Sequence, residues 1–444
     1  MVTGCFGWWH CRVGLAIMMH DWRTRHWVGN TIGKARPCSS VLYITYDGLM
    51  EPLGQSQVMP YLCGLSGDYG IAVLSFEKRE DWENLAKRQA QQGEMHRLMM
   101  RWMPLRYHKR PSIFATAFDI AQGLRYSLAY IAQNKFGIVH VRSYVSGVIG
   151  LALKKAAGAR LIFDMRGFWP DEKVDAGAWR HGSLIYRIMK WVEKKLLLHA
   201  DVVVSLTRAA VAEMKQFPYL KNKNIHYVVI PTCTNLKLFC PEENMRKNDL
   251  PFTLGYIGSV GTFYLFDEVL EFYKVMIKQD SSVRFLIVNR NDHKFIDERI
   301  KALAAPIANI ELACADYYEM PDQIRRMNAG VFFIKPTFSK KSSAPTRLGE
   351  LLGCGVPCVV NDGIGDMTPI IEDNQVGYVM RDFSPASRER AVAALLSLVR
   401  DPSTQPRCVA AAKRHFALES GVESYRHIYQ ELLAKSNGVR AMSV

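Results

Sequence analysis

The chain has 444 residues, more than one ordinary hydrophobic core accommodates, so two domains of common size are expected. Hydrophobic residues make up 49% and charged residues 22%, a balance that excludes a disordered or fibrous chain. No apolar run approaches the ~20 residues that span a bilayer, and the 10 cysteines lack paired metal-ligand spacing. We therefore expect a cytoplasmic protein with reduced thiols and no secretory leader.

The formal net charge of +15 is concentrated in the first half of the chain. Residues 1–230 contain 31 Lys and Arg against 17 Asp and Glu, whereas residues 231–444 contain 26 against 25. Such a one-sided field indicates an anionic partner for the first half. The charge alone leaves three partners open: a membrane face, a lipid-linked phosphate and nucleic acid.

Residues 1–40 come first in chain order and show neither helical nor strand periodicity. They contain four tryptophans and three histidines, and their cysteine and histidine spacing fits no zinc site. We predict a poorly ordered or atypical N-terminal extension.

Residues 41–230 alternate between short apolar runs typical of buried strands and longer segments typical of helices. The predicted strands cover residues 41–45, 71–76, 101–106, 138–141, 160–164 and 201–206. The predicted helices cover residues 58–63, 80–99, 111–133, 146–156 and 183–199. This alternation indicates a parallel sheet with helices on both faces.

Residues 231–251 interrupt the pattern with prolines, asparagines and mixed charge, and we interpret them as a linker. Alternation resumes over residues 252–410, with predicted strands at 252–257, 283–288, 309–313, 331–334 and 358–360. The predicted helices cover residues 264–278, 292–304, 321–328, 385–400 and roughly 403–435. We assign residues 411–444 to a C-terminal helix that packs toward the first domain, and a tail. The sequence thus predicts an α/β protein with two doubly wound Rossmann-like parallel-sheet domains facing each other across a cleft.

The most informative stretch is residues 340–350, between the predicted strands 331–334 and 358–360. Such a segment lies at the carboxyl edge of a parallel sheet, where ligands bind. Its serines and threonine suit helix caps, Pro345 suits the first turn, and two lysines stand beside free backbone N–H groups. This arrangement suits a phosphate, and Glu350, about one turn into the helix, suits a ribose diol. A capped surface helix with two solvated lysines is the alternative.

Four blocks in this order resemble the two-Rossmann-domain (GT-B) glycosyltransferases, specifically the retaining enzymes of glycosyltransferase family 4. They are residues 45–57, 164–169, 255–262 and 340–350. The resemblance implies that the second domain binds a nucleotide-sugar donor and that the first binds a glycan or lipid-linked acceptor. It places Glu350 at the nucleotide ribose, as the second glutamate of the family's Glu-x7-Glu motif.

The sequence departs from the family pattern at two places. Ser342 occupies the position of the first glutamate, which in relatives usually meets the donor sugar. Ser259 and the uncharged residues 263–265 occupy the positions of an arginine and a lysine that clamp the diphosphate. Because the departing diphosphate gains negative charge, we hypothesise that one or two of Lys335, Lys340 and Lys341 replace the clamp. The alternative is that they are surface lysines on a loop.

The candidate donor-binding residues are therefore the glycine loop and the 340–350 stretch with its neighbouring lysine: Gly258, Ser259, Gly261, Thr262, Lys335, Lys340, Lys341, Ser342, Ser343, Thr346 and Glu350. On the acceptor side, the candidates are Gly48, Gly54 and Gln55, which belong to the loop after the first strand.

The catalytic residue is not identified by the sequence, and the candidates are Arg142, Asp164 and Arg166, each at a predicted strand end. An arginine and an aspartate there suit an acceptor hydroxyl or phosphate, or a structural ion pair. The resemblance implies that the leaving phosphate takes the acceptor proton, so that no side-chain base is required.

Residues 97–110 interleave five Lys and Arg with apolar and aromatic residues. This mixture suits an anionic bilayer surface, and predicts a protein that binds peripherally to the inner face of the membrane. A solvated basic face is the alternative.

Other classes of function are less consistent with the sequence. The chain lacks an Asp-x-Asp motif, a Walker loop and a Gly-x-Gly-x-x-Gly fingerprint, so we expect neither a metal nor a cofactor, only a nucleotide-diphosphate sugar as co-substrate. A nucleotide-sugar epimerase of the same fold is the nearest alternative. A basic nucleic-acid-binding protein would explain the charge but not the sugar-nucleotide-like motifs, so no nucleic acid is expected as a partner.

Overall fold

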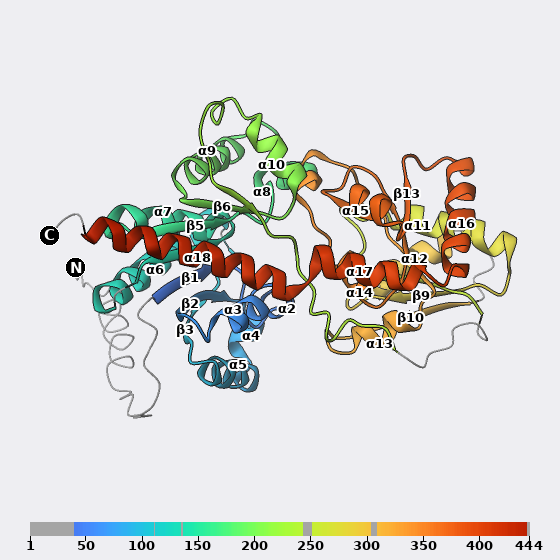
Figure 1. Ribbon diagram of the computed structural model, residues 1–444, viewed down its shortest axis with the longest axis horizontal. Coiled ribbons are helices and arrows are strands. Elements are labelled where there is room, and N and C mark those ends of the chain that lie inside the picture. Colours follow the sequence, from blue (N-terminus) through green and yellow to red (C-terminus); the bar gives the residue numbers. More distant parts are fainter. Residues whose placement is uncertain (1–39, 111, 135, 243–250, 303–308, 442–444) are drawn as a thin grey trace, which may run out of the picture. The chain divides into compact units, whose positions relative to one another are not determined.

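The computed structural model describes residues 40–110, 112–134, 136–242, 251–302 and 309–441 (Figure 1). The predicted extension at residues 1–40 lies outside this part, apart from Ser40. The described chain contains two fully parallel sheets with helices packed on them, which confirms the predicted pair of Rossmann-like domains.

The first sheet has seven strands in the order β3-β2-β1-β4-β5-β6-β7. β1 is an interior strand and pairs in parallel with β2 and β4, so that Tyr43 stands opposite Val73 on one side and His140 on the other. The sheet is covered on both faces, which explains why its strands are nearly continuous apolar runs. The strands are β1 (Ser40–Thr45), β2 (Gly70–Glu77), β3 (Arg101–Arg106), β4 (Ile138–Arg142), β5 (Arg160–Asp164), β6 (Val202–Ser205) and β7 (Tyr227–Val229).

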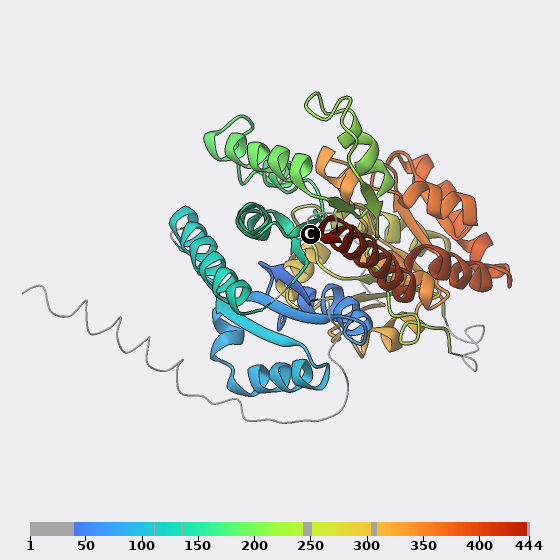
Figure 2. The same cartoon turned by 60° about the vertical axis from the view of Figure 1, so that its left-hand side comes forward.

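Two groups of helices bury the two faces of this sheet. One face packs against α3, α5 and the C-terminal helix α18, and the other packs against α7, α9 and α10. Figure 2 shows α6, α7 and α9 as neighbours in one layer, and α7 contacts both of the others. The helices are α2 (Pro52–Gln57), α3 (Met59–Leu65), α4 (Arg79–Glu83), α5 (Leu85–Arg97), α6 (Ser112–Gln133), α7 (Ser143–Ala157), α8 (Trp169–Asp175), α9 (Leu184–His199) and α10 (Arg208–Lys215).

The second sheet has six strands in the order β10-β9-β8-β11-β12-β13. The strand order reverses between β8 and β11, which is the switch point where ligands of doubly wound sheets bind. The strands are β8 (Thr253–Ile257), β9 (Arg284–Val288), β10 (Ile310–Ala313), β11 (Ala329–Val331), β12 (Cys358–Asn361) and β13 (Gly377–Met380). The helical segments are α11 (Phe266–Gln279), α12 (His293–Ala302), α13 (Met320–Arg325), the short η2 (Phe338–Ser342), α14 (Thr346–Gly353), α15 (Met367–Asn374), α16 (Pro385–Arg400) and α17 (Thr404–Phe416).

Two helices that the sequence predicts as continuous are broken. The helix predicted over residues 80–99 divides at Asn84, whose side chain caps the second part by accepting from the N–H of Lys87 at 3.0 Å. The helix predicted over 403–435 divides at Ala417 into α17 and α18 (Leu418–Ala441). At this break the backbone of Thr234 bonds to both helices. Its N–H donates to the carbonyl of Phe416 at 2.7 Å, and its carbonyl accepts from the N–H of Leu418 at 3.1 Å.

Candidate functional site

The switch point of the second sheet is formed by two segments that lie side by side. The loop after β8 contains Gly258 and Gly261, both with left-handed φ values (+96° and +78°), and Thr262, with φ of +46°. Hydrogen bonds of 3.0 Å and 2.8 Å join this loop to the chain that follows β11, from Leu265 to Phe333 and from Lys335 to Phe263. The predicted glycine loop therefore lies beside the predicted 340–350 segment.

Arg347, in the first turn of α14, lies between these two segments. Its guanidinium carbon stands 4.3 Å from the ring centre of Tyr264 and 5.3 Å from that of Tyr256. It also reaches Gly258, where an added Cβ would come within 2.5 Å of Nη2. Glycine at this position therefore leaves room for the arginine beside the loop.

Glu350 follows Arg347 by one helical turn and is partly buried. Burial raises the pKa of Glu350 to about 7, while the positive charge of Arg347 acts in the opposite direction. Glu350 is thus a carboxyl group that changes its charge near neutral pH.

Two of the candidate lysines contact residues of the first domain. Lys340 Nζ lies 3.6 Å from the ring centre of Phe263 and 3.4 Å from a carboxylate oxygen of Glu172 in α8. Lys341 Nζ forms a 2.5 Å ion pair with Glu213 in α10. Lys335 is exposed.

Ser342 and Thr346 of the 340–350 segment bond to the first domain, and neither caps α14. The N-cap of α14 is Pro345, and no side chain caps it, so the predicted Ser/Thr cap is wrong. The Ser342 hydroxyl accepts from the backbone N–H of Phe168 at 3.0 Å, and Thr346 Oγ1 accepts from Gln57 at 3.3 Å. Ser342 is buried, and its hydroxyl is occupied by this contact. Ser343 is partly buried.

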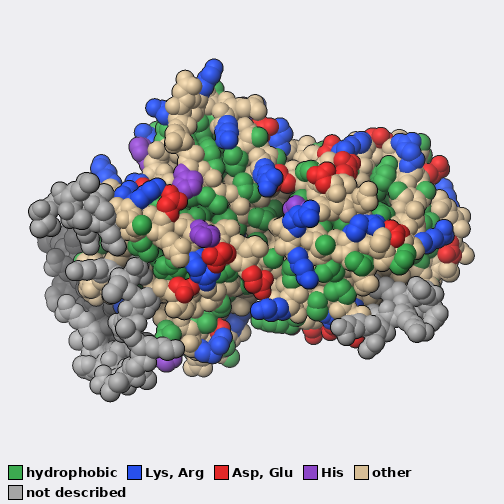
Figure 3. All heavy atoms as spheres, viewed as in Figure 1, with side chains coloured by type: hydrophobic (Ala, Val, Ile, Leu, Met, Phe, Trp, Pro, Cys, Tyr) green, Lys and Arg blue, Asp and Glu red, His purple; other side chains and the backbone are tan. Residues whose placement is uncertain are grey.

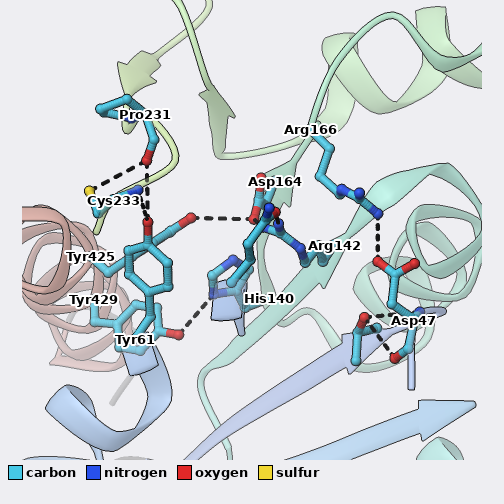
Figure 4. Close-up of polar contacts among 12 residues, drawn as sticks. Asp47, Tyr61, His140, Arg142, Asp164, Arg166, Pro231, Cys233, Tyr425 and Tyr429 are labelled. Atoms are coloured by element: carbon cyan, nitrogen blue, oxygen red, sulfur yellow. Dashed lines mark hydrogen bonds and ion pairs between the residues drawn. The ribbon is translucent and has the colours of Figure 1, made fainter. Parts of the chain in front are cut away.

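The three catalytic candidates form two ion pairs at the carboxyl edge of the first sheet (Figure 4). Arg142 and Asp164 are both buried and meet at 2.5 Å, and Tyr425 of α18 reaches the same carboxylate at 3.3 Å. Arg166, which has a φ of +60°, pairs with Asp47 at 2.6 Å, and both are partly exposed. Only this second pair is open to solvent.

Comparison with known proteins identifies the class of this chain. Residues 71–232 match the model of the glycosyl transferase 4-like domain. Among solved structures, sucrose-phosphate synthase from Thermosynechococcus elongatus superposes with a TM-score of 0.66 at 15% identity, covering 89% of this chain and all of that one. HepE from Anabaena, in complex with UDP and glucose, gives 0.62 at 11% identity over 88% of this chain and 100% of its own. The galactosyltransferase WaaB of the lipopolysaccharide outer core gives 0.57 at 11% identity over 88% and 99%. No curated protein sequence matches.

Residues 71–232 are a glycosyl transferase 4-like domain, in a chain that has the GT-B fold of glycosyltransferases. This match is consistent with the predicted resemblance to glycosyltransferase family 4, and it contains the sequence block at residues 164–169. The similarity to the solved structures, at these identities, shows the GT-B fold alone.

The acceptor-side candidates of this glycosyltransferase are engaged in holding the loop after β1. Two carboxylates accept hydrogen bonds from its backbone N–H groups. Glu51 accepts from Gly48 at 3.2 Å, and the buried Glu77 accepts from Leu49 at 2.9 Å and from Met50 at 3.2 Å. Gln55 donates to the Leu49 carbonyl at 2.6 Å and to Gln91 at 2.7 Å. Gly54 permits a close approach, because an added Cβ would come within 2.1 Å of the Gly48 carbonyl. The loop is therefore rigid, and its glycines serve packing.

Sequence reasoning missed the residues that join the two domains of the glycosyltransferase. Asp366 accepts from the backbone N–H groups of Arg208 and Ala209, at 2.7 and 2.9 Å, and Asp175 accepts from Ser339 at 3.0 Å. It also missed Arg347, although this arginine belongs to the stretch that the sequence singled out. In the described ranges, no group of His, Cys, Asp or Glu could hold a metal ion, and no helix is long and apolar enough to cross a membrane.

Proposed function

We propose that this glycosyltransferase moves a sugar from a nucleoside diphosphate sugar to a glycan or lipid-linked acceptor, with retention of anomeric configuration. The observation that carries the proposal is the convergence of a glycine loop, a buried arginine and a titratable glutamate at the switch point of the second sheet. A diphosphate and a ribose diol are the groups that such donors present.

In this proposal the second domain binds the donor. The Gly258–Thr262 loop brings backbone close to the diphosphate, and Glu350 accepts from the ribose. The wider set of proposed donor contacts is the one derived from sequence: Gly258, Ser259, Gly261, Thr262, Lys335, Lys340, Lys341, Ser342, Ser343, Thr346 and Glu350. Solved HepE structures contain UDP or UDP-glucose, and that of the pneumococcal O-GlcNAc transferase GtfA contains UDP and GlcNAc (TM-score 0.52, 17% identity).

The acceptor then lies against the first domain, which belongs to the half of the chain that carries nearly all the excess positive charge. The partly exposed Arg166–Asp47 pair is the polar group suited to an acceptor hydroxyl, and the buried Arg142–Asp164 pair lies at the same edge of the sheet. We keep Gly48, Gly54 and Gln55 as the residues that shape this side. The acceptor proton passes to the leaving phosphate, so the reaction requires no side-chain base.

Donor binding is tested first by thermal shift with a panel of nucleoside diphosphate sugars. A ligand present at about 100 times its Kd adds about 2.7 kcal/mol to the free energy of unfolding, so one member of the panel should raise the Tm by several degrees. NMR of the product anomer then tests retention. Turnover of the donor in the absence of any acceptor would instead indicate the epimerase, and binding of DNA without any nucleotide-sugar binding would contradict the proposal.

We also propose peripheral binding to an anionic membrane, but through a surface other than the predicted residues 97–110. In that segment Met100, Trp102 and Leu105 are buried in or beside β3, so they cannot face a bilayer. Met99 of that segment is exposed, but a larger group of exposed apolar side chains lies on α6 and α9, which pack on the same helix α7: Ile113, Phe114, Phe118, Leu184, Ile188 and Trp191.

The charges around this α6–α9 surface suit anionic lipid. Arg187 and Lys194 are exposed between the apolar residues of α9. The one carboxylate of each helix, Asp119 in α6 and Glu193 in α9, is buried. Basic side chains are also prominent over α9 and α10 at the upper left of Figure 3, whereas both signs mix over the second domain. Apolar and basic groups without exposed acid are typical of a membrane-binding face.

Co-sedimentation with vesicles tests this surface. The wild type should bind vesicles that contain phosphatidylglycerol, and should bind less at high salt because surface charges are screened. The double variant Phe114→Ser, Trp191→Ser should bind at least about tenfold more weakly, since each aromatic side chain contributes about 1.5–3 kcal/mol when buried. Tyr318→Ser, which removes an exposed aromatic of the second domain, is the matched control. Equal binding of the double variant and the control would contradict the proposal.

A further inference from the structure

Arg347 is a buried cation without a counter-ion among the described residues. Its side chain is only 8% exposed, and Nη1 has no hydrogen-bond partner in the described chain. Glu350 lies on the same helix and influences it electrostatically, yet the two form no ion pair. An uncompensated buried charge costs several kcal/mol, so a protein keeps one where a ligand supplies the opposite charge.

Three aromatic rings fix the guanidinium in place. Tyr264 lies 4.3 Å from its carbon, while Tyr256 and Phe332 lie at 5.3 and 5.4 Å. The Tyr256 hydroxyl also interacts with it. Cation–π contacts of this kind hold a planar donor group without neutralising its charge. The guanidinium is therefore preorganised, and its Nη1 group remains available as a donor.

Arg347 lies beside the glycine loop, next to the positions where the family resemblance implies a diphosphate clamp. The sequence carries Ser259 and the uncharged residues 263–265 where relatives are expected to have an arginine and a lysine. Lys341 is paired with Glu213, and Lys340 is enclosed between Phe263 and Glu172. Arg347 touches Gly258 itself, on the loop that the diphosphate approaches.

We propose that Arg347 binds the diphosphate of the sugar donor, and that it takes the place of the absent arginine–lysine clamp. The proposal rests on the proposed function, because it assumes that the second domain binds a nucleoside diphosphate sugar. A guanidinium bonds two phosphate oxygens at once, which fixes the diphosphate over the glycine loop.

The same contact stabilises the leaving group during transfer. The bond between the anomeric carbon and the β-phosphate oxygen breaks, and its electron pair stays on that oxygen. The acceptor oxygen bonds to the anomeric carbon, and its proton passes to the leaving phosphate. Charge on the phosphate increases as the bond breaks, and a fixed cation stabilises that charge without reorganisation.

Arg347→Met tests the assignment, because methionine fills a similar volume without charge. Binding of UDP, ADP, GDP and inorganic pyrophosphate is measured by calorimetry and thermal shift. The variant should bind the nucleoside diphosphate preferred by the wild type about 10–100-fold more weakly, the effect of losing a hydrogen-bonded charge. Its ligand-free Tm should stay equal or rise, because a buried unpaired cation is removed. Arg347→Lys should recover part of the affinity, and Arg299→Met, which removes an exposed arginine of the same domain, should match the wild type.

Two outcomes would overturn the inference, and they differ from failure of the proposed function. If Arg347→Met binds the nucleoside diphosphate as tightly as the wild type, the arginine does not contact the diphosphate. If its ligand-free Tm falls steeply while the affinity of the folded protein is kept, the arginine is a packing residue. If the wild type binds no nucleoside diphosphate and no pyrophosphate, the donor-site proposal fails, and the inference fails with it.

Discussion

Asp164→Ala should lower the free energy of unfolding by about 3–5 kcal/mol, the effect of leaving one member of a buried ion pair alone. Arg142 is only 5% exposed, and its guanidinium donates hydrogen bonds to Asp164 at 2.5 Å and to Gln57 at 2.9 Å. Without the carboxylate, a buried positive charge remains, and Tyr425 loses the oxygen that it reaches at 3.3 Å. Urea denaturation followed by circular dichroism measures the change.

The other ion pair at the same sheet edge supplies a matched control. Asp47→Ala removes the partner of Arg166, but both side chains are partly exposed, so the loss should stay below about 1 kcal/mol. The double variant Arg142→Met, Asp164→Leu should regain most of the stability, because it removes both buried charges together. If Asp164→Ala unfolds like the wild type and loses turnover alone, Asp164 acts on substrate instead of supporting the sheet.

The buried pair also connects the two halves of the candidate site. Gln57 accepts from Arg142 and donates to Thr346 in the first turn of α14, so one chain of contacts runs from Asp164 to the helix that carries Arg347. Changes at Asp164 should therefore weaken nucleotide binding as well as stability, through positioning of α14.

The alternating strands and helices could be predicted from the sequence because strands buried on both faces leave continuous apolar runs. The breaks at Asn84 and Ala417 could not, since the second depends on Thr234, nearly two hundred residues away in the chain. Contacts between residues distant in the chain also limit how much of the candidate site could be predicted from the sequence. The sequence shows that Lys341 and Arg347 are basic, but not that Glu213 pairs with the first, or that no carboxylate in the described part of the chain pairs with the second.

Ser342 is another residue whose structural role could not be predicted from the sequence. Its departure from the family's glutamate is visible in the sequence, but its structural use is not. The hydroxyl accepts from Phe168 and donates to the carbonyl of Ser339 at 2.6 Å, so it joins the two domains. Gly167 also has to be small there, because an added Cβ would come within 2.9 Å of the serine oxygen. A glutamate at this position would not fit the same packing.

Glu350→Gln should change the pH dependence of both nucleotide affinity and stability. The folded-state pKa of Glu350 is raised from 4.5 to about 7, so the folded protein holds this proton more tightly than the unfolded chain. The stability that this group contributes is fully present below about pH 4.5 and is lost as pH rises to about 7. The glutamine variant should therefore gain up to about 3 kcal/mol over the wild type at pH 8 and almost nothing at pH 4.

The nucleotide affinity of the wild type should increase with pH, whereas the contribution of Glu350 to stability decreases. The ionised carboxylate accepts hydrogen bonds from the ribose diol more strongly than the neutral acid, so wild-type affinity for the preferred nucleoside diphosphate should rise between about pH 6 and pH 8. In Glu350→Gln the affinity should be lower at pH 8 and nearly independent of pH over that range. Calorimetry at several pH values measures both. A more stable variant that keeps wild-type affinity at pH 8 would place the ribose elsewhere, because the titration of Glu350 would then affect the fold and not the ligand.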